Sequence, residues 1–180
     1  MRKFMILAAT AACAIPAAAA ADPPSSSTPN PSQTCSAERT RIGQVAFGQL
    51  YGTNANRANA FGKCVAKQAA LQRGDAARAS ARCRAEQDDA NFAATHGGKT
   101  FTQFYGTNAN GRNAFGKCVS GKARAANDAR QRTEVNAARA CRAEQLAGPA
   151  AFRVKYGTNA NKSNAFGRCV SAKARAQNPS

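Results

Sequence analysis

Histidine and carboxylate side chains are scarce in this sequence of 180 residues. It contains one histidine, His96, and nine Asp and Glu against 26 Lys and Arg. Hydrolytic sites need a nucleophile beside a base, or two carboxylates that flank the scissile bond. Neither pair can be assembled from residues that recur along this chain, so we expect a protein that is not an enzyme. A secreted hydrolase is the least favoured alternative.

Patterns for metal ions and nucleotides are also missing. The cysteines include no Cys-x-x-Cys pair, and the single histidine is better explained as an exposed loop residue than as a base, so no metal site is expected. Residues 111–118, GRNAFGKC, approach a phosphate-binding loop. However, Cys118 replaces the hydroxyl that binds magnesium, and Arg57 and Lys162 replace the first glycine in the sister segments. We therefore expect no cofactor.

Long apolar runs are confined to the N-terminus. The run from Phe4 to Ala21 follows two basic residues and ends in small residues, which is the form of a secretory signal peptide with cleavage after Ala21. A lipoprotein that is cleaved before Cys13 and lipidated there is the alternative. No later segment is apolar enough to cross a membrane. The mature chain is therefore expected to be secreted, without a transmembrane segment.

Three nearly identical strings dominate the rest of the sequence. They read YGTNANRANAFGKCV at residues 51–65, YGTNANGRNAFGKCV at 105–119 and YGTNANKSNAFGRCV at 156–170. A Cys-x-Ala-Glu sequence precedes each string, and such a repeat indicates tandem structural units. The predicted organisation is a signal peptide (1–21), a flexible Pro- and Ser-rich linker (22–34) and three repeats (35–74, 75–128 and 129–180).

Each repeat is predicted to be a helical hairpin, which makes the fold class all-α. Alanine is abundant in both halves of the unit, and Phe61, Cys64 and Val65 fall at helical spacing in the second half. Gly62 and its counterparts interrupt that helix, where a glycine costs about 1 kcal/mol relative to alanine. We expect a partner helix to cross closely at these glycines.

The turn between the two helices carries residues typical of helix caps. The tyrosine of each motif is followed by a glycine, Gly52 in the first repeat, which we expect to end the first helix as a left-handed cap. Thr53, Asn54 and Asn56 then offer side-chain acceptors for the free amide groups that begin the second helix. The sequence leaves open whether this asparagine-rich loop also has a functional role.

Six cysteines follow the predicted signal peptide, two in each repeat, which indicates disulfides. The repeat pattern favours pairing within units: Cys35 with Cys64, Cys83 with Cys118, and Cys141 with Cys169. The opposing scheme joins Cys64 to Cys83 and Cys118 to Cys141, which leaves the first and last cysteines without partners. A small unit has a thin core, so each bond should contribute on the order of 3.5 kcal/mol.

One glutamate and one tyrosine also recur in every unit. The glutamates Glu38, Glu86 and Glu144 follow the first cysteine of each unit by three residues. We expect them to form ion pairs with a nearby arginine or with the basic residue that directly precedes the second cysteine. The tyrosines are expected to pack on the phenylalanine four residues earlier, and stacking on bases or sugars is the alternative.

The net charge of +17 indicates which classes of partner this chain attracts. Charge of that size favours nucleic acid, anionic lipid or an anionic polymer of the cell envelope. The alternative is a structural or protein-interaction array whose charge only keeps the chain soluble. The candidate polyanion-binding residues recur around the second cysteine of each unit: Lys63, Lys67, Lys117, Lys122, Arg124, Arg168, Lys173 and Arg175. The sequence predicts no oligomeric state.

Across residues 35–175 the motif YGTNAN, followed by NAFGKCV, resembles a repeat module of secreted, alanine-rich bacterial proteins. This resemblance implies export and tandem repetition. It implies no activity, ligand or catalytic residue.

Overall fold

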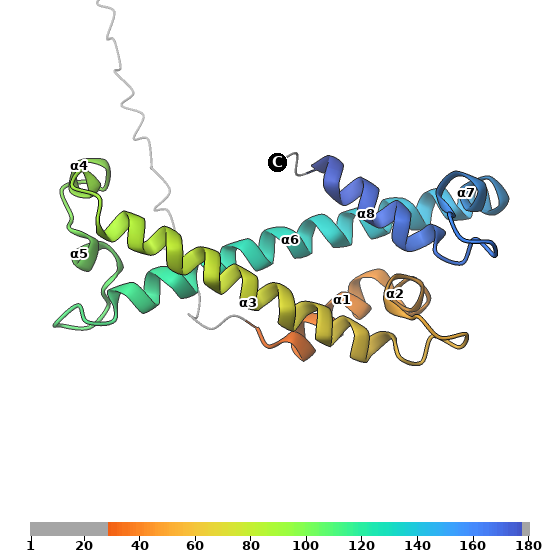
Figure 1. The fold of residues 1–180 in the computed structure, drawn as a ribbon, viewed down its shortest axis with the longest axis horizontal. Coiled ribbons are helices and arrows are strands. Elements are labelled where there is room, and N and C mark those ends of the chain that lie inside the picture. The colour runs from red at the N-terminus through yellow and green to blue at the C-terminus, as the bar shows by residue number, and fades with distance from the viewer. Residues whose placement is uncertain (1–28, 178–180) are drawn as a thin grey trace, which may run out of the picture.

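Eight helices and no strand make up residues 29–177, the part of the chain described by a computed structural model (Figure 1). The helices are α1 (Pro31–Ile42), α2 (Gln44–Tyr51), α3 (Ala60–Gln87), α4 (Phe92–Thr95), α5 (Phe101–Tyr105), α6 (Ala114–Ala147), α7 (Pro149–Tyr156) and α8 (Ala165–Gln177). The predicted all-α fold is confirmed. The predicted signal peptide, Cys13 and most of the predicted linker lie outside the described residues. No helix in the described part is both long and apolar enough to span a membrane.

The first helix begins earlier than the repeat pattern predicts. The Asn30 side-chain oxygen accepts a 2.8 Å hydrogen bond from the Gln33 amide, and the Gln33 side chain accepts one from the Asn30 amide at 3.2 Å. This reciprocal pair caps α1. Pro31 lies in the first turn, where a missing N–H removes no helical hydrogen bond. Residues 31–34, part of the predicted linker, are therefore helical.

Two long helices join the repeats without a linker between them. Helix α3 carries Cys64 of the first repeat and Cys83 of the second, and α6 carries Cys118 of the second and Cys141 of the third. The predicted repeat boundaries at residues 74/75 and 128/129 consequently fall inside these two helices. Helices α3 and α6 pack against each other and run in opposite directions (Figure 1).

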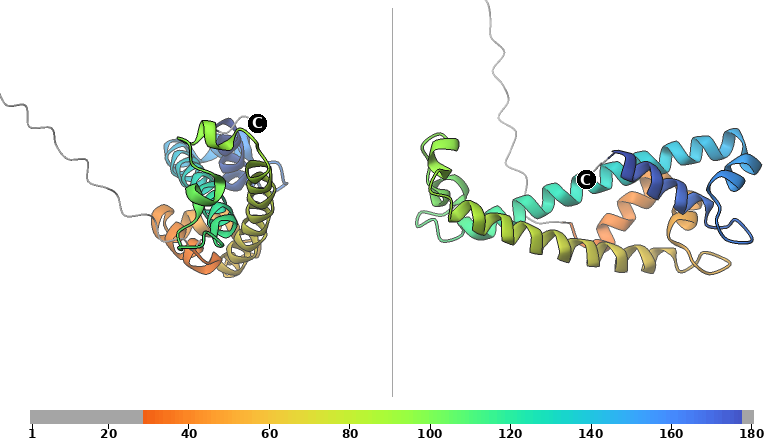
Figure 2. Two further views of the ribbon diagram at one scale, coloured as in Figure 1. Left: turned by 90° about the vertical axis from the view of Figure 1, so that its left-hand side faces the viewer. Right: turned by 45° about the horizontal axis from the view of Figure 1, so that its top comes forward.

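The two long helices bring the first and third repeats together at one end of the molecule and place the second repeat at the other end (Figure 2). Between the ends, the buried Asp75 of α3 binds Arg130 of α6 at 2.5 Å. Buried side chains of the first and third repeats, including Phe47 and Phe152, form one shared core. The second repeat has a separate, smaller core: Cys83, Phe92, Phe101, Ala114 and Cys118.

Each repeat has its own disulfide bond. The bonds are Cys35–Cys64, Cys83–Cys118 and Cys141–Cys169, and the paired Cα atoms are 6.0 Å apart in each. The predicted pairing within units is confirmed. Disulfides form and persist in oxidising compartments, so the three bonds indicate that this chain folds in such an environment.

The glycine after each tyrosine is required for space and not for a left-handed conformation. Gly52, Gly106 and Gly157 have φ angles of −70°, −69° and −75°. The predicted left-handed cap is therefore wrong. A Cβ on Gly52 would lie 2.6 Å from the Gly48 carbonyl oxygen and 2.8 Å from the Arg57 Cβ, so any larger residue would collide with the end of α2.

The left-handed residue comes later in the loop. It is Arg57 (φ 58°), Gly111 (φ 62°) or Lys162 (φ 55°) in the three repeats. The Arg57 side chain turns back and Nη1 donates to the carbonyl oxygens of Gly48 and Gln49 at 3.2 and 3.1 Å. Lys162 Nζ donates similarly, at 3.1 Å, to the carbonyl oxygen that follows α7. These cations satisfy the last carbonyls of a helix, where positive charge is favourable.

The loop asparagines close the loop on itself. In each repeat one asparagine accepts from the amide of the loop threonine and donates to its hydroxyl: Asn59 with Thr53 at 3.0 and 2.7 Å, Asn113 with Thr107 at 3.1 and 2.7 Å, and Asn164 with Thr158 at 3.0 and 2.7 Å. Helices α3 and α6 begin without a side-chain cap. The prediction that loop residues 53–56 cap the second helix is therefore wrong.

The glycines inside the second helices are not sites of close helix crossing. A Cβ on Gly62 or Gly116 would meet nothing within 4 Å, and one on Gly167 would lie 4.0 Å from the Leu50 carbonyl oxygen. The predicted close crossing is wrong, and nothing in the packing explains why these positions are glycine.

Candidate functional site

A tyrosine and a glutamate form a hydrogen bond in every repeat. Each hydroxyl donates to a carboxylate: Tyr51 to Glu38 at 2.8 Å, Tyr105 to Glu86 at 2.8 Å and Tyr156 to Glu144 at 3.1 Å. Each tyrosine ring also packs on the phenylalanine four residues earlier, with ring centroids 4.9 Å apart. The predicted packing of the tyrosines on these phenylalanines is confirmed.

In the second and third repeats a lysine joins this pair. Lys122 binds Glu86 at 2.7 Å, and Lys173 and Lys155 bind Glu144 at 3.2 and 2.7 Å. Burial alone would raise the pKa of Glu86, but hydrogen bonds from its lysine and tyrosine outweigh it and lower that pKa. The hydrogen bond from Lys155 is the main cause that lowers the pKa of Glu144 to about 2. The predicted basic partner, directly before the second cysteine, is wrong, since a lysine four residues after that cysteine takes this role in both repeats.

The first repeat lacks a lysine at this position, which is occupied by the fully buried Gln68. Its lysine lies one residue earlier, and Lys67 binds Glu134 of α6. Glu38 is 2 % exposed, and burial, followed by the charge of Glu134, raises its pKa to about 7. Burial also raises the pKa of the Tyr51 hydroxyl, which therefore remains a donor at neutral pH. The lysine is displaced by one residue in the first repeat, and there the partly exposed ion pair of the other two repeats is replaced by a buried carboxyl group.

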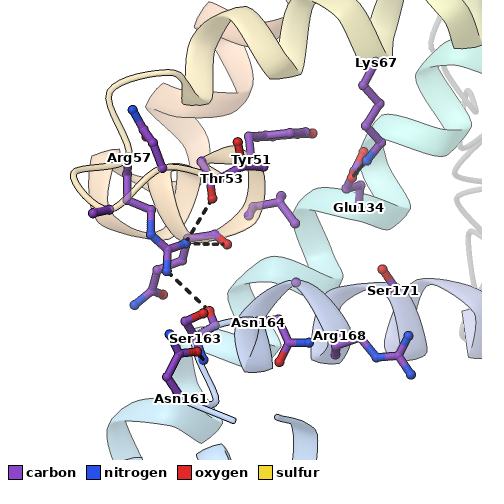
Figure 3. Close-up of a pocket in the computed structure, with 16 residues that line it drawn as sticks. Tyr51, Thr53, Arg57, Lys67, Glu134, Asn161, Ser163, Asn164, Arg168 and Ser171 are labelled. Atoms are coloured by element: carbon purple, nitrogen blue, oxygen red, sulfur yellow. Dashed lines mark hydrogen bonds and ion pairs between the residues drawn. The ribbon is translucent and has the colours of Figure 1, made fainter. Parts of the chain in front are cut away.

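A cleft of about 900 Å³ lies between the first and third repeats (Figure 3). The first repeat contributes its loop around Asn54, and the third contributes Asn161 and Ser163 from its own loop. Arg57 Nη2 donates to the Ser163 carbonyl oxygen at 3.3 Å and ties the two loops together. Lys67, paired with a glutamate of α6, lines the cleft from the long helices (Figure 3).

The side chains of this cleft are mainly hydrogen-bonding groups. The Tyr51 hydroxyl is bound to Glu38, and the Glu134 carboxylate is bound to Lys67. Amide side chains of the two loops and the exposed Arg168 also line the cleft. Among the described residues, no group of three His, Cys, Asp or Glu side chains is placed to hold a metal ion.

The eight candidate polyanion-binding residues fall into two groups. Four form ion pairs with carboxylates: Lys67, Lys122, Arg124 and Lys173. The other four are not part of any ion pair within residues 29–177: Lys63, Lys117, Arg168 and Arg175. The structure does not gather the eight into one patch, because the first and third repeats lie at the opposite end from the second (Figure 2).

His96 is more enclosed than an exposed loop residue. Its ring stacks on Phe92 with centroids 3.8 Å apart and meets Phe104 edge-on at 4.7 Å. The Nδ1 atom lies 2.9 Å from the Phe92 carbonyl oxygen. His96 was predicted to be an exposed loop residue. It does lie in a loop, but it is not fully exposed, because its ring covers the small core of the second repeat.

Glu134 is the residue of the cleft that sequence reasoning missed. It lies in the connecting stretch between motifs, where no repetition draws attention to it. A signal was nevertheless present, because Lys67 stands three residues after its cysteine, whereas Lys122 and Lys173 stand four residues after theirs. The odd register indicates that Lys67 has a different partner.

Comparison with known proteins identifies no relative, since no protein-family model, no curated protein and no solved structure matches this chain.

Proposed function

We propose that this chain is an exported, non-enzymatic protein that binds anionic polymers through its basic surface. The observation that carries the proposal is the imbalance of charge on the folded part, because residues 29–177 contain 24 Lys and Arg and eight Asp and Glu. Seven of these cations form ion pairs with carboxylates of the described residues. The rest have no carboxylate partner in this part of the chain, so the protein attracts anions along its length.

Export is part of the proposal. The predicted signal peptide at residues 1–21 delivers the chain to a compartment that permits disulfides. The three disulfides fit such a compartment. Anionic polymers of the cell envelope are the ligand class that an exported basic protein meets there.

Three basic residues at one repeat position are the proposed distributed contacts: Lys63, Lys117 and Arg168. Each lies near the N-terminus of its helix, where no acidic residue occupies the first turn. The partial positive charge of a helix N-terminus adds to that of the side chain. Because these residues lie at both ends of an elongated molecule, one polymer chain can engage several of them, and linked weak contacts reinforce each other.

Retention of the mature chain on immobilised polymers tests the proposal. We expect inorganic polyphosphate, a poly(glycerol phosphate) wall polymer and duplex DNA to retain it until salt is added, and neutral dextran to release it at once. The variant K63Q/K117Q/R168Q keeps the described ion pairs and disulfides. It should elute from duplex DNA at lower salt, because each lost phosphate contact reduces the salt slope by about 0.9.

Absence of retention on all three anionic polymers at low salt would contradict the proposal. The charge would then act only on solubility, and the structural-array alternative would take its place.

A further inference from the structure

A groove between α1 and α6 gathers arginines that the repeat motif does not predict. Its volume is about 650 Å³, and we call it the α1–α6 groove. Arg41 of α1 lines one side, and Arg132 and Arg139 of α6 line the other. The two α6 residues are seven positions apart, so they share a helix face and are separated by about 10.5 Å of helix rise.

These three guanidinium groups are available to a ligand. All three residues are exposed, and no ion pair or side-chain hydrogen bond joins any of them to another described residue. Asp128 lines one end of the groove, where its carboxylate lies 3.7 Å from Arg124. The α1–α6 contact is held by a different arginine, since Arg142 Nη1 donates to the last carbonyl of α1 at 3.0 Å. The three groove arginines therefore form no ion pair or side-chain hydrogen bond in the described fold, although the positive charge of Arg41 partly opposes the rise in the pKa of Glu38.

Residues beneath the arginines add polar atoms without partners. Thr34 lines the groove and is 3 % exposed, and its hydroxyl oxygen has no hydrogen-bond partner within the described chain. Gln131 also lines the groove, and its side-chain nitrogen is likewise buried without a hydrogen-bond partner in the described chain. Unpaired buried polar groups are unfavourable, but both atoms are closed to solvent, so the exposed arginines and not these atoms are the groups that a ligand in the groove contacts.

We propose that the α1–α6 groove binds one strand of a linear polyanion without bases, with its anionic groups held by the three arginines. Arginine forks bind phosphate and carboxylate groups through paired hydrogen bonds. None of the described residues that line the groove is aromatic, so nucleobases find no stacking surface among them. A recess of about 650 Å³ is of a size to hold a short stretch of a single polymer strand. This inference rests on the proposed function and narrows its ligand class.

Calorimetric titration of the mature chain with inorganic polyphosphate and with a polyuronate tests the groove and separates phosphate from carboxylate ligands. The variant R41Q/R132Q/R139Q should bind at least about tenfold more weakly than the wild type at the same salt concentration. The matched control R82Q/K99Q/R112Q removes the same charge from exposed residues of the second repeat. Its affinity should fall by less than about threefold. Circular dichroism verifies that both variants keep their helices.

The charge-preserving variant R132K/R139K sharpens the test, because it should still lose affinity if paired hydrogen bonds matter.

The inference is supported if R41Q/R132Q/R139Q loses affinity for one of the two polymers and the control variant does not. The polymer that is affected then identifies the anionic group. Equal losses in the two triple variants overturn the groove but leave the proposed function standing. Absence of binding by the wild type overturns both. Tighter, groove-dependent binding of single-stranded DNA than of polyphosphate overturns the base-free ligand.

Discussion

The two ends of this molecule are built from one repeat but are stabilised in different ways. At the end shared by the first and third repeats, Phe47, Phe152 and Phe166 are at most 2 % exposed within a common core. At the other end, five buried residues form the core of the second repeat, and Phe104 is still 45 % exposed. A repeat that packs against its sister gains from hydrophobic burial, whereas a repeat on its own depends more on its disulfide.

The two ends of the molecule also differ in the environment of the tyrosine–glutamate pair that occurs in every repeat. In the second repeat Glu86 is partly exposed and held by Lys122, which keeps it ionised. In the first repeat, docking against α6 buries Glu38 and brings the charge of Glu134 near it. Association of two repeats therefore changes the protonation of a side chain that the motif itself keeps constant.

Removal of the Cys83–Cys118 disulfide should produce the largest difference in stability between the two ends of the molecule. Cys83→Ser with Cys118→Ser opens a loop with a sequence separation of 35 residues and should cost about 4 kcal/mol. Because the surrounding core is small, α4 and α5 should exchange their amide hydrogens rapidly, while the other end stays protected. Hydrogen exchange followed by mass spectrometry measures both ends at once.

The corresponding variant of the first repeat, Cys35→Ser with Cys64→Ser, is the control. It loses a similar loop constraint, but the shared core should keep α1 and α2 protected. Equal loss of protection at the two ends would contradict the proposed difference between them.

Glu38 should make stability depend on pH. Its folded-state pKa of about 7 lies above the ordinary value of 4.5, so the folded state binds the proton more tightly than the unfolded state. The resulting stability is fully present below pH 4.5 and is lost as the pH rises through about 7, by up to about 3 kcal/mol. Glu38→Gln should remove this loss, because an amide accepts the Tyr51 hydrogen bond without a charge.

Urea unfolding between pH 4 and pH 9 measures this contribution. At pH 8 we expect Glu38→Gln to be more stable than the wild type and Glu86→Gln to be less stable, since the pKa of Glu86 is lowered and its ionised form is favoured. If Glu38→Gln were less stable than the wild type at pH 8, ionisation of the buried carboxyl group would not destabilise the folded state, which would contradict the prediction.

Two glycines of the second repeat should respond to alanine with opposite signs. Gly111 has φ 62°, and its Cβ would lie 2.1 Å from the Thr102 Cγ2, so Gly111→Ala should destabilise by about 1–2 kcal/mol. Gly116 lies in α6 with open space around its Cβ position, so Gly116→Ala should stabilise by up to about 1 kcal/mol. Thermal unfolding of the two variants compares them, and a shift of the same sign in both would contradict this account of the loop and helix.

Local patterns predicted the helices and the disulfides well. The spacing of Phe61, Cys64 and Val65 is a short-range property, and so is the presence of two cysteines in each repeat. The continuous helices across residues 74 and 128 could not be predicted from repeat logic, because the repeat itself suggests separate units. The prediction of a linker over residues 22–34 overlooked the Asn30–Gln33 capping box, which is a local pattern and marks the start of α1.

Features that depend on tertiary contacts were predicted poorly. The pKa of Glu38 follows from the packing of α6. The steric role of Gly52 follows from the exact path of the backbone, which brings the Gly48 carbonyl oxygen and Arg57 close to it. Repeat spacing contains neither. The groove arginines were missed because Arg41 and Arg132 come from different repeats and non-motif positions. Net charge predicted a class of ligand, while the fold decides which cations remain unpaired.

The affinity of the mature chain for inorganic polyphosphate as a function of salt concentration tests the central claim most directly. The proposed function predicts tight binding at 50 mM salt and a linear fall of log affinity with log salt, of at least about tenfold by 200 mM. An affinity that does not change with salt, or an absence of binding at 50 mM, would contradict it.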